Sequence, residues 1–329
     1  MVPILLLLSS IPYSTQSTTG STVRWYVASG RASDNVEFAK TSPKALTGFY
    51  GCCHDLLVSK NGSISTADNL STTVSLHRHA LDSLGRVLTY HSTFSVEAEA
   101  ILSGVAKSIA PNLAKIAKDS GVDGLLCDYE PDFNYTVEHA QKYADFLSAV
   151  RKELNGLDLE LGMDVAGWGI LDKFDIYADV ADFFTSMSPT YNAGNLTRNR
   201  DFVGEMTRTL GSDKVKVGLG SSPATGYEKN CANMPTYNYT ESNLTPFLDY
   251  LKTNAQVSGV DIWKCDIDNY GKTADFFLDA IVQFKEESPG SPCSGHRCDT
   301  LACPCGCECG TDADPGLCYV PAHVSDECE

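Results

Sequence analysis

The sequence lacks an apolar run long enough to span a membrane, and it has few basic residues. The apolar stretch at its N-terminus is shorter than the roughly 20 residues that a transmembrane helix needs. Lysine and arginine together number 25 against 42 aspartates and glutamates, so the formal net charge is −17. Nucleic acids and anionic membrane surfaces would repel such a chain and are not expected as partners. Neutral ligands such as sugars are compatible with this charge.

Motifs that hold metals or phosphates are also missing. No glycine-rich phosphate loop follows the first predicted strand, and no His-x-Glu-x-x-His pattern occurs. The segment "HRH" at His77 to His79 is expected to be exposed on a loop or helix rather than to bind a metal. We therefore expect neither a cofactor nor a metal ion.

The first 20 residues are typical of a secretory signal peptide. "MVPILLLLSSIPYSTQS" combines an apolar run with small polar residues, although it has no positive charge at its start. An apolar N-terminal strand is the alternative interpretation. Six Asn-x-Ser/Thr sequons and 13 cysteines favour a secreted or lysosomal glycoprotein. The predicted glycosylation sites are Asn61, Asn69, Asn134, Asn195, Asn238 and Asn243.

The cysteines divide the chain into two parts. Eight of them lie in the last 37 residues, where almost no aliphatic residues could form a core. We expect a disulfide-stabilised tail at 288–329, with thiolate ligation of a soft metal as the alternative for "CPCGCEC". The odd total leaves one thiol free, and Cys127, inside an apolar run, is expected to be that buried thiol.

Residues 21–287 are predicted to form a (β/α)8 TIM barrel. Eight apolar, strand-like runs alternate with helix-like segments, and eight parallel strands close such a barrel. The runs begin at Val23, Ala45, Gly85, Val122, Leu159, Asp182, Lys214 and Gly259. Among the helices, 97–121 should be kinked or broken near Pro111, and 137–155 should begin after Thr136 and stop at Gly156. An open, doubly wound sheet is the rival fold.

Polar residues at the ends of these strands are candidates for a functional site, because barrels carry their chemistry at the C-terminal ends of the strands. Asp128 and Glu130 stand two apart and should face the same side. Together with aromatic residues, such acids suit a sugar site, where a ring stacks on the sugar and an acid protonates the glycosidic oxygen. The other candidates are Asp164, Tyr191, Asn192, Trp263, Asp266 and Asp268.

The segment "DGLLCDYE" resembles the signature of family 18 glycoside hydrolases, the chitinase family. That signature reads Asp-x-x-Asp-x-Asp-x-Glu; Asp123, Asp128 and Glu130 match it, and Leu126 replaces the second Asp. "SPTYN" and "GVDIWKCDID" resemble the family's sixth- and eighth-strand motifs. Within the family, the stretch from Leu159 to Asn192 looks most like the di-N-acetylchitobiase branch.

The resemblance implies a glycosidase that cleaves β-1,4-linked N-acetylglucosamine with help from the substrate's own acetamide. Glu130 would be the general acid, Asp128 would orient the acetamide, and Tyr191 would hydrogen-bond it. Trp263 would form the floor of the sugar site. Further substrate-binding residues would be Asp164, Asn192 and Asp123.

Leu126 keeps a second function open. In the family, an inner Asp at this place tunes the proton on the next Asp, and leucine cannot do so. The chain could therefore be a lectin that binds N-acetylglucosamine sugars without cleaving them, although the intact Glu130 favours an enzyme. A third possibility is an extracellular structural protein whose barrel presents the cysteine-rich tail.

Overall fold

The computed structural model describes residues 21–28, 31–66, 70–82, 88–131, 136–224, 239–263, 273–286, 308–309 and 318–319. The predicted signal peptide and most of the predicted tail lie outside these residues, apart from strands β10 (Glu308–Cys309) and β11 (Cys318–Tyr319), which pair antiparallel. The predicted residues that also lie outside are Asn69, Asn134, Asn238, Asp266 and Asp268.

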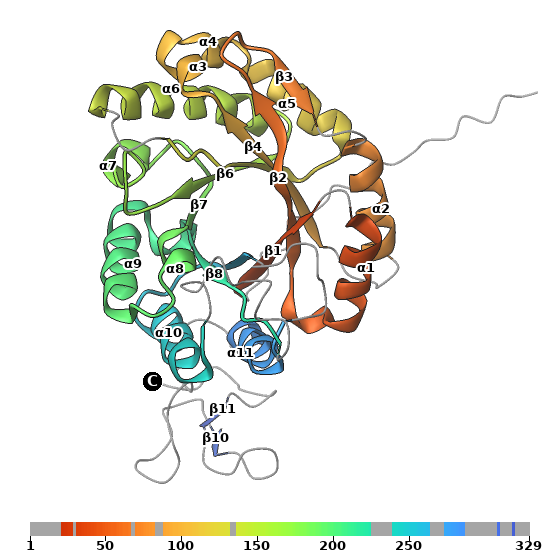
Figure 1. Cartoon of the computed structure of the whole chain (residues 1–329), viewed down its shortest axis with the longest axis vertical. Coiled ribbons are helices and arrows are strands. Elements are labelled where there is room, and N and C mark those ends of the chain that lie inside the picture. The colour runs from red at the N-terminus through yellow and green to blue at the C-terminus, as the bar shows by residue number, and fades with distance from the viewer. Residues whose placement is uncertain are drawn as a thin grey trace, which may run out of the picture.

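Eight parallel strands form a closed barrel (Figure 1), which confirms the predicted (β/α)8 fold. Strand β1 pairs with both β2 and β9, and these two pairings close the sheet. The strands, in the order in which they are hydrogen-bonded, are β1 (Thr22–Ala28), β9 (Gly259–Trp263), β8 (Val215–Gly220), β7 (Phe183–Ser186), β6 (Glu160–Val165), β5 (Gly124–Cys127), β4 (Thr89–Val96) and β2 (Gly48–Val58). A short strand that the sequence did not predict, β3 (Ile64–Thr66), adds antiparallel to β2 outside the barrel.

Helices surround the barrel and cover the outer face of its strands (Figure 1), while the inner face is enclosed by the closed sheet. All residues of β5, β7 and β8 are buried. The helices are α1 (Ala32–Thr41), α2 (Leu70–Asp82), α3 (Ala98–Ser103), α4 (Val105–Ser108), α5 (Ala110–Ser120), α6 (Val137–Asn155), α7 (Phe174–Tyr177), α8 (Ser188–Tyr191), α9 (Leu196–Leu210), α10 (Glu241–Thr253) and α11 (Asp275–Glu286).

The sequence predicted the ends of α6 and the break before α5. The Thr136 side chain caps α6 by accepting a hydrogen bond from the backbone N–H of His139, and Gly156 follows the last turn. The predicted helix at 97–121 is three helices, interrupted at Gly104, whose φ is +78°, and at Ile109. Pro111 lies in the first turn of α5, where its missing N–H leaves no hydrogen bond unmade.

Two cysteine observations bear on the predicted redox environment. Cys127 is free and buried, as predicted, and the hydroxyl of Tyr143 donates to its Sγ at 3.2 Å. Burial raises the pKa of the Cys127 thiol, so it behaves as a small apolar group. Cys52 and Cys53, adjacent in β2, form a disulfide across a cis peptide bond.

The expectation that "HRH" is exposed was wrong for its first residue. His77 lies on α2 and is fully buried. Its Nε2 lies 2.6 Å from Nδ2 of Asn35 on α1, and its Nδ1 lies 2.8 Å from the carbonyl oxygen of Thr73. The partner is 42 residues away in the chain, so the local pattern could not indicate it. His79, on the outer side of the same helix, is exposed.

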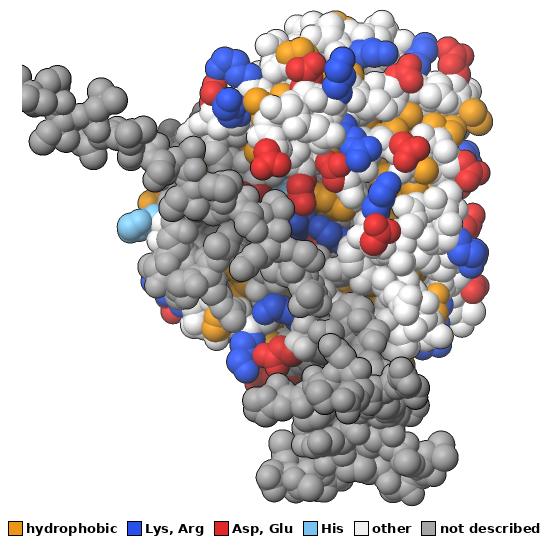
Figure 2. Space-filling model, turned by 180° about the vertical axis from the view of Figure 1, so that it is seen from behind, with side chains coloured by type: hydrophobic (Ala, Val, Ile, Leu, Met, Phe, Trp, Pro, Cys, Tyr) orange, Lys and Arg blue, Asp and Glu red, His pale blue; other side chains and the backbone are white. Residues whose placement is uncertain are grey.

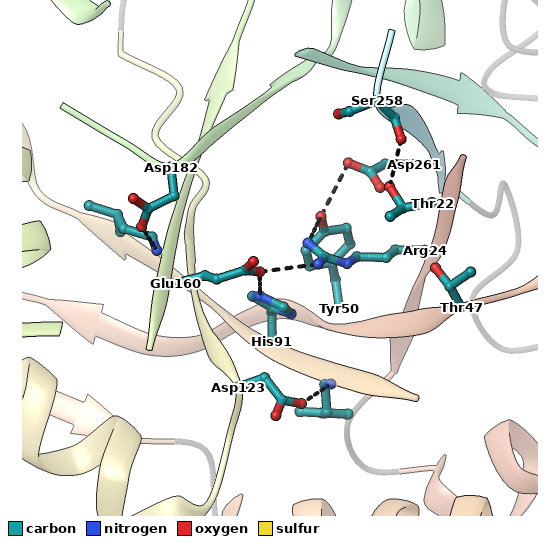
Figure 3. A network of polar contacts seen from close by, with 12 residues as sticks. Thr22, Arg24, Thr47, Tyr50, His91, Asp123, Glu160, Asp182, Ser258 and Asp261 are labelled. Carbon is teal, nitrogen blue, oxygen red and sulfur yellow. Dashed lines mark hydrogen bonds and ion pairs between the residues drawn. The ribbon is translucent and has the colours of Figure 1, made fainter. Parts of the chain in front are cut away.

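The interior of the barrel holds a network of buried polar groups (Figure 3). Arg24 on β1 donates to the hydroxyl of Tyr50 at 3.1 Å and forms an ion pair with Glu160 at 3.1 Å. Asp261 accepts from Tyr50 at 3.2 Å and from Thr185 at 2.6 Å. Arg24 is 5% exposed and Asp261 is fully buried, so their charges must be compensated within the barrel.

Two more basic groups face this network. His91 Nε2 lies 2.9 Å from Glu160 Oε2. Burial, and then the charge of Arg24, lower the pKa of His91 to about 4, so at neutral pH a neutral imidazole donates this hydrogen bond. Burial and Arg24 also lower the pKa of Lys216 to about 7, and its Nζ lies 3.7 Å from the centre of the Phe183 ring.

We predict that Arg24→Met destabilises the fold by about 3 kcal/mol, because it leaves the buried Asp261 without one of the cations that offset its charge. Urea denaturation at pH 7 measures this loss. The control is Lys115→Met, which removes an exposed partner of Asp119 on α5 and should change the free energy of unfolding by less than about 0.5 kcal/mol. Equally small changes in both variants would contradict a structural role for the network.

A second prediction concerns acid stability. The folded state keeps His91 neutral down to about pH 4, whereas an unfolded imidazole gains its proton below about pH 6.5. Between these values the unfolded state binds the extra proton, so the free energy of unfolding falls as the pH falls. His91→Gln should reduce the slope of the free energy of unfolding against pH by the amount that about one proton contributes. Urea denaturation from about pH 4 to about pH 6.5 measures this slope.

The exposed His79→Gln is the matched control, and its slope should equal that of the unmodified protein. Burial lowers the pKa values of His77 and His139 as well, and these residues account for slope that persists in His91→Gln. An unchanged slope in His91→Gln would show that His91 is not neutral in the folded state.

Candidate active site

A pocket of about 330 Å³ opens at the C-terminal end of the barrel strands. Its place is where barrels carry their active sites. Strands β1, β6, β7, β8 and β9 and the segments that follow β5 and β7 supply its walls. The lining residues are Tyr26, Asp128, Glu130, Asp164, Thr185, Ser186, Met187, Thr190, Tyr191, Gly218 and Trp263.

The two carboxylates of the signature reach this pocket from the end of β5. The backbone N–H of Asp128 donates to the carbonyl oxygen of Phe94 at 2.9 Å, so the chain stays extended beyond Cys127. Asp128 and Glu130 both line the pocket. Tyr129 lies between them on the opposite side, where its hydroxyl lies 2.9 Å from His139 Nε2 of α6. The alternation of an extended chain therefore brings both acids to one side.

Aromatic side chains form the rest of the mouth. Tyr191, the last residue of α8, donates from its hydroxyl to Oε1 of Glu130 at 3.3 Å. Trp168 packs edge-on against Tyr191, with ring centres 5.4 Å apart. Trp263, the last residue of β9, lies 5.1 Å from the ring centre of Tyr26. The pocket thus combines an acid, a phenol that contacts it and a partly exposed indole.

Asp164 is the most deeply buried acid of the pocket. It lies on β6, is 1% exposed, and accepts a hydrogen bond from the hydroxyl of Tyr26 at 3.1 Å. Burial raises the pKa of Asp164 well above its usual range, and the charges of Asp128 and Asp261 raise it further.

Leu126 lies below the pocket in an apolar layer of the barrel interior. It is fully buried and clusters with Tyr26, Tyr50, Cys52 and Phe183. The place where the resemblance expects an inner Asp is therefore filled by packed hydrocarbon. No cation or amide of this cluster could take over the function of that Asp.

A glycine allows the segment after β7 to approach the barrel closely. A Cβ at Gly218 on β8 would lie 2.5 Å from the carbonyl oxygen of Ser186 and 2.6 Å from Oγ1 of Thr190. Neither distance is possible for a real side chain, so a larger residue would displace α8. Gly218 thereby keeps Tyr191 in contact with Glu130.

Two predicted site residues do not belong to this pocket. Asp123 precedes β5 and so lies at the N-terminal end of the barrel, where it accepts from the backbone N–H of Tyr90 at 2.7 Å and pairs with Arg78 at 2.8 Å. Asn192 turns away and donates to the carbonyl oxygen of Ser188 at 3.2 Å. These contacts give both residues a structural function, and neither is placed to bind a ligand in the pocket.

Several pocket residues were not predicted from the sequence. They are Tyr26, Thr185, Ser186, Met187, Thr190 and Gly218. A signal for Tyr26 was present, because Arg24 and Tyr26 alternate with apolar residues in the first strand and so share one face. Thr185, Ser186, Met187 and Thr190 lie in the same predicted run as Tyr191, and Gly218 lies in the next run, which begins at Lys214.

The described residues show neither a metal site nor a membrane span. No three His, Cys, Asp or Glu side chains among them are grouped to hold a metal ion. Within the same ranges, no helix has the length and apolar character to cross a bilayer. On the face shown in Figure 2, acidic and basic side chains of the described part are interspersed rather than gathered by sign.

Comparison with known proteins relates this barrel to enzymes that act on glycans. Residues 34–161, less than half of the chain, match the profile of glycosyl hydrolase family 85. The matched family is one of glycoside hydrolases, and the similar solved structures include glycoside hydrolases. No curated protein sequence matches the chain.

Three solved structures illustrate the structural likeness. The C-terminal domain of a putative chitinase from Desulfitobacterium hafniense has a TM-score of 0.63 at 12% identity, covering 80% of this chain and 99% of that one. A family 18 chitinase from Pseudoalteromonas aurantia has a TM-score of 0.59 at 17% identity, covering 80% of this chain and 100% of that one. A family 18 N-acetylglucosaminidase from Paenibacillus barengoltzii has a TM-score of 0.58 at 16% identity, covering 80% of this chain and 99% of that one. At these identities the likeness shows the fold.

Proposed function

We propose that this chain is a glycosidase that hydrolyses β-1,4-linked N-acetylglucosamine in chitooligosaccharides or N-glycan cores, by substrate-assisted retaining catalysis. The observation that carries the proposal is the pocket itself, in which Glu130, Asp128, Tyr191 and Trp263 meet although they come from three separate segments. The family 85 match and the chitinase and N-acetylglucosaminidase barrels support the same class of substrate.

Glu130 is the group best placed to act as the general acid. Its carboxyl lies at the mouth of the pocket, within reach of a glycosidic oxygen, and one of its oxygens accepts from Tyr191 at 3.3 Å. The Glu130 proton would pass to the leaving oxygen as the bond from that oxygen to the anomeric carbon breaks. The resulting carboxylate would later take a proton from the water that completes hydrolysis.

The substrate's acetamide would supply the nucleophile. Its carbonyl oxygen attacks the anomeric carbon, and the positive charge of the cyclic intermediate develops beside Asp128, which lines the same wall. Asp128 would accept a hydrogen bond from the acetamide N–H, and the hydroxyl of Tyr191 would contact the acetamide oxygen. Attack by water on the opposite face then restores the original anomeric configuration.

The remaining pocket residues would bind the sugar. Trp263 presents a partly exposed indole, held against Tyr26, on which the apolar face of a pyranose could stack. Asp164 contributes polar lining deep in the pocket. No residue of the proposal requires a cofactor.

The second candidate function is a lectin for the same sugars. Leu126 favours it, because the inner carboxyl partner of Asp128 is replaced by packed hydrocarbon. A structural protein that presents the cysteine-rich tail is the third candidate. If the intact chain binds these sugars, it is a glycosidase or a lectin. If it does not bind them, the structural function is favoured.

We also propose that the protein is secreted or lysosomal and is glycosylated. The apolar N-terminus and the sequons support this location, and so does the Cys52–Cys53 disulfide, because disulfides are rare in reducing compartments. Of the described sequon residues, Asn61 and Asn195 are exposed, and Asn243 is partly buried in the capping box of α10.

Glu130→Gln should lower kcat/KM for fluorogenic N-acetylglucosamine di- and trisaccharides by about 10²–10⁴, because the amide cannot donate the proton. Calorimetry should show that the variant still binds the trisaccharide. The control is Glu138→Gln, an exposed glutamate in the first turn of α6, which should keep full activity. Absence of turnover in the unmodified protein, with intact sugar binding, would assign the lectin function instead.

Trp263→Ala should raise KM for the same substrates by about tenfold, because the sugar loses its stacking surface. Trp263→Phe, which keeps an aromatic face, should raise it less. Steady-state kinetics of the two variants test this ranking. If both variants bind and turn over sugar like the unmodified protein, the indole is a core residue and not a platform.

A further inference from the structure

The register of two neighbouring barrel strands places Asp164 beside Asp128. On β5 and β6, Leu126 lies opposite Gly162 and Cys127 lies opposite Met163. The chain stays extended after Cys127, since the N–H of Asp128 continues the ladder to β4. Continuing the register by one residue sets Asp128 opposite Asp164, and cross-strand neighbours of this kind have side chains about 5 Å apart on the same face.

Three carboxyl groups therefore share one small pocket. Asp128, Glu130 and Asp164 all line it. Asp164 is the innermost, 1% exposed, and Asp128 is 8% exposed. Glu130 is the exposed member at the mouth. Such a cluster cannot ionise completely in a low-dielectric site, because like charges held this close repel strongly.

The groups that face Asp164 identify it as the member that keeps a proton. From β1 it meets the hydroxyl of Tyr26, and from β9 it meets the charge of Asp261. Asp128 and Glu130 face it from the segment after β5. On the other sides, Tyr50 on β2 and the Cys127 thiol on β5 interact with it.

The nearby cations act elsewhere. Burial raises the pKa of Asp261, and Lys216 and Arg24 act against this rise. The same two cations favour the ionised form of Glu160. The strongest charge effects on Asp164 come from other acids and raise its pKa. Burial and the neighbouring acids thus both favour the protonated form of Asp164.

We propose that Asp164 is the positioning partner of Asp128, and that this pair shares one proton across two strands in place of the in-strand acid that Leu126 has replaced. A protonated Asp164 keeps the pocket from gaining a third negative charge. Asp164 thereby holds the Asp128 carboxyl in place while the acetamide binds. The catalytic consequence rests on the proposed function, whereas the shared proton can be measured without turnover.

The first experiment detects the proton directly. Infrared spectra of the full chain at pH 7 should contain the carbonyl band of a buried carboxylic acid, and Asp164→Asn should lose it. In Asp128→Asn the midpoint at which this band disappears should move to lower pH, because one repelling charge is gone. The control is Asp175→Asn, an exposed aspartate on α7, which should leave band and midpoint unchanged.

Thermal unfolding supplies a second readout that does not depend on activity. A carboxyl whose pKa is raised in the folded state makes stability fall as the pH rises above about 4, because the unfolded state then releases its proton. Asp164→Asn removes this effect. The Tm of the variant should exceed that of the unmodified protein by an amount that grows from about pH 4 to neutral pH.

Activity then tests the function of the pair. Since an amide resembles a neutral carboxylic acid and cannot ionise, Asp164→Asn should lose the alkaline decline of kcat/KM caused by ionisation of the pair, whereas Asp175→Asn should keep that decline.

Three outcomes would overturn the inference. They are a carboxylic acid band that survives in Asp164→Asn, a midpoint that does not move in Asp128→Asn, and an alkaline decline that the amide leaves unchanged. If the unmodified protein has no turnover, the proposed function fails, but the infrared result still decides whether Asp164 holds the proton.

Discussion

The structure depends on compensating charge inside a closed barrel. Eight strands and their covering helices shut the interior off from water, so each acid within it needs a cation, a hydrogen bond or a proton. At the lower level Arg24 supplies the cation for Glu160 and, through Tyr50, reaches Asp261. At the upper level the strongest charge effects on Asp164 come from other acids of the described residues, and the proposed shared proton takes the place of a cation. The chemistry proposed for the pocket follows from this difference between the two levels.

Strand geometry determines which side chains reach the pocket. Alternation along the chain after β5 directs Asp128 and Glu130 to the pocket and Tyr129 to α6. Leu126 and Phe183 belong to an apolar cluster of the barrel interior, and Thr185 links the pocket to the ionic network by its hydrogen bond to Asp261. The apolar packing around Leu126 explains why the barrel tolerates a leucine where the resemblance expects an acid.

Local sequence patterns predicted the parts that depend on neighbours in the chain. The eight strands, the cap at Thr136 and the shared side of Asp128 and Glu130 all follow from periods of two or 3.6 residues. Patterns could not show at which end of β5 Asp123 lies, because the signature extends beyond both ends of that strand. They also could not reveal contacts set by register or by distant helices, namely those of Asp164 with Asp128 and of His77 with Asn35. Burial of His77 and the cross-strand acid pair are tertiary properties.

The central claim is that the substrate's acetamide takes the place of an enzyme nucleophile in this pocket. Proton NMR of the first products formed from tri-N-acetylchitotriose, run beside the matching trisaccharide that carries hydroxyl groups in place of the acetamides, tests it most directly. The account predicts that only the acetamido sugar is cleaved and that its new reducing end first appears in the β configuration. An α product, or equal cleavage of both sugars, would contradict it.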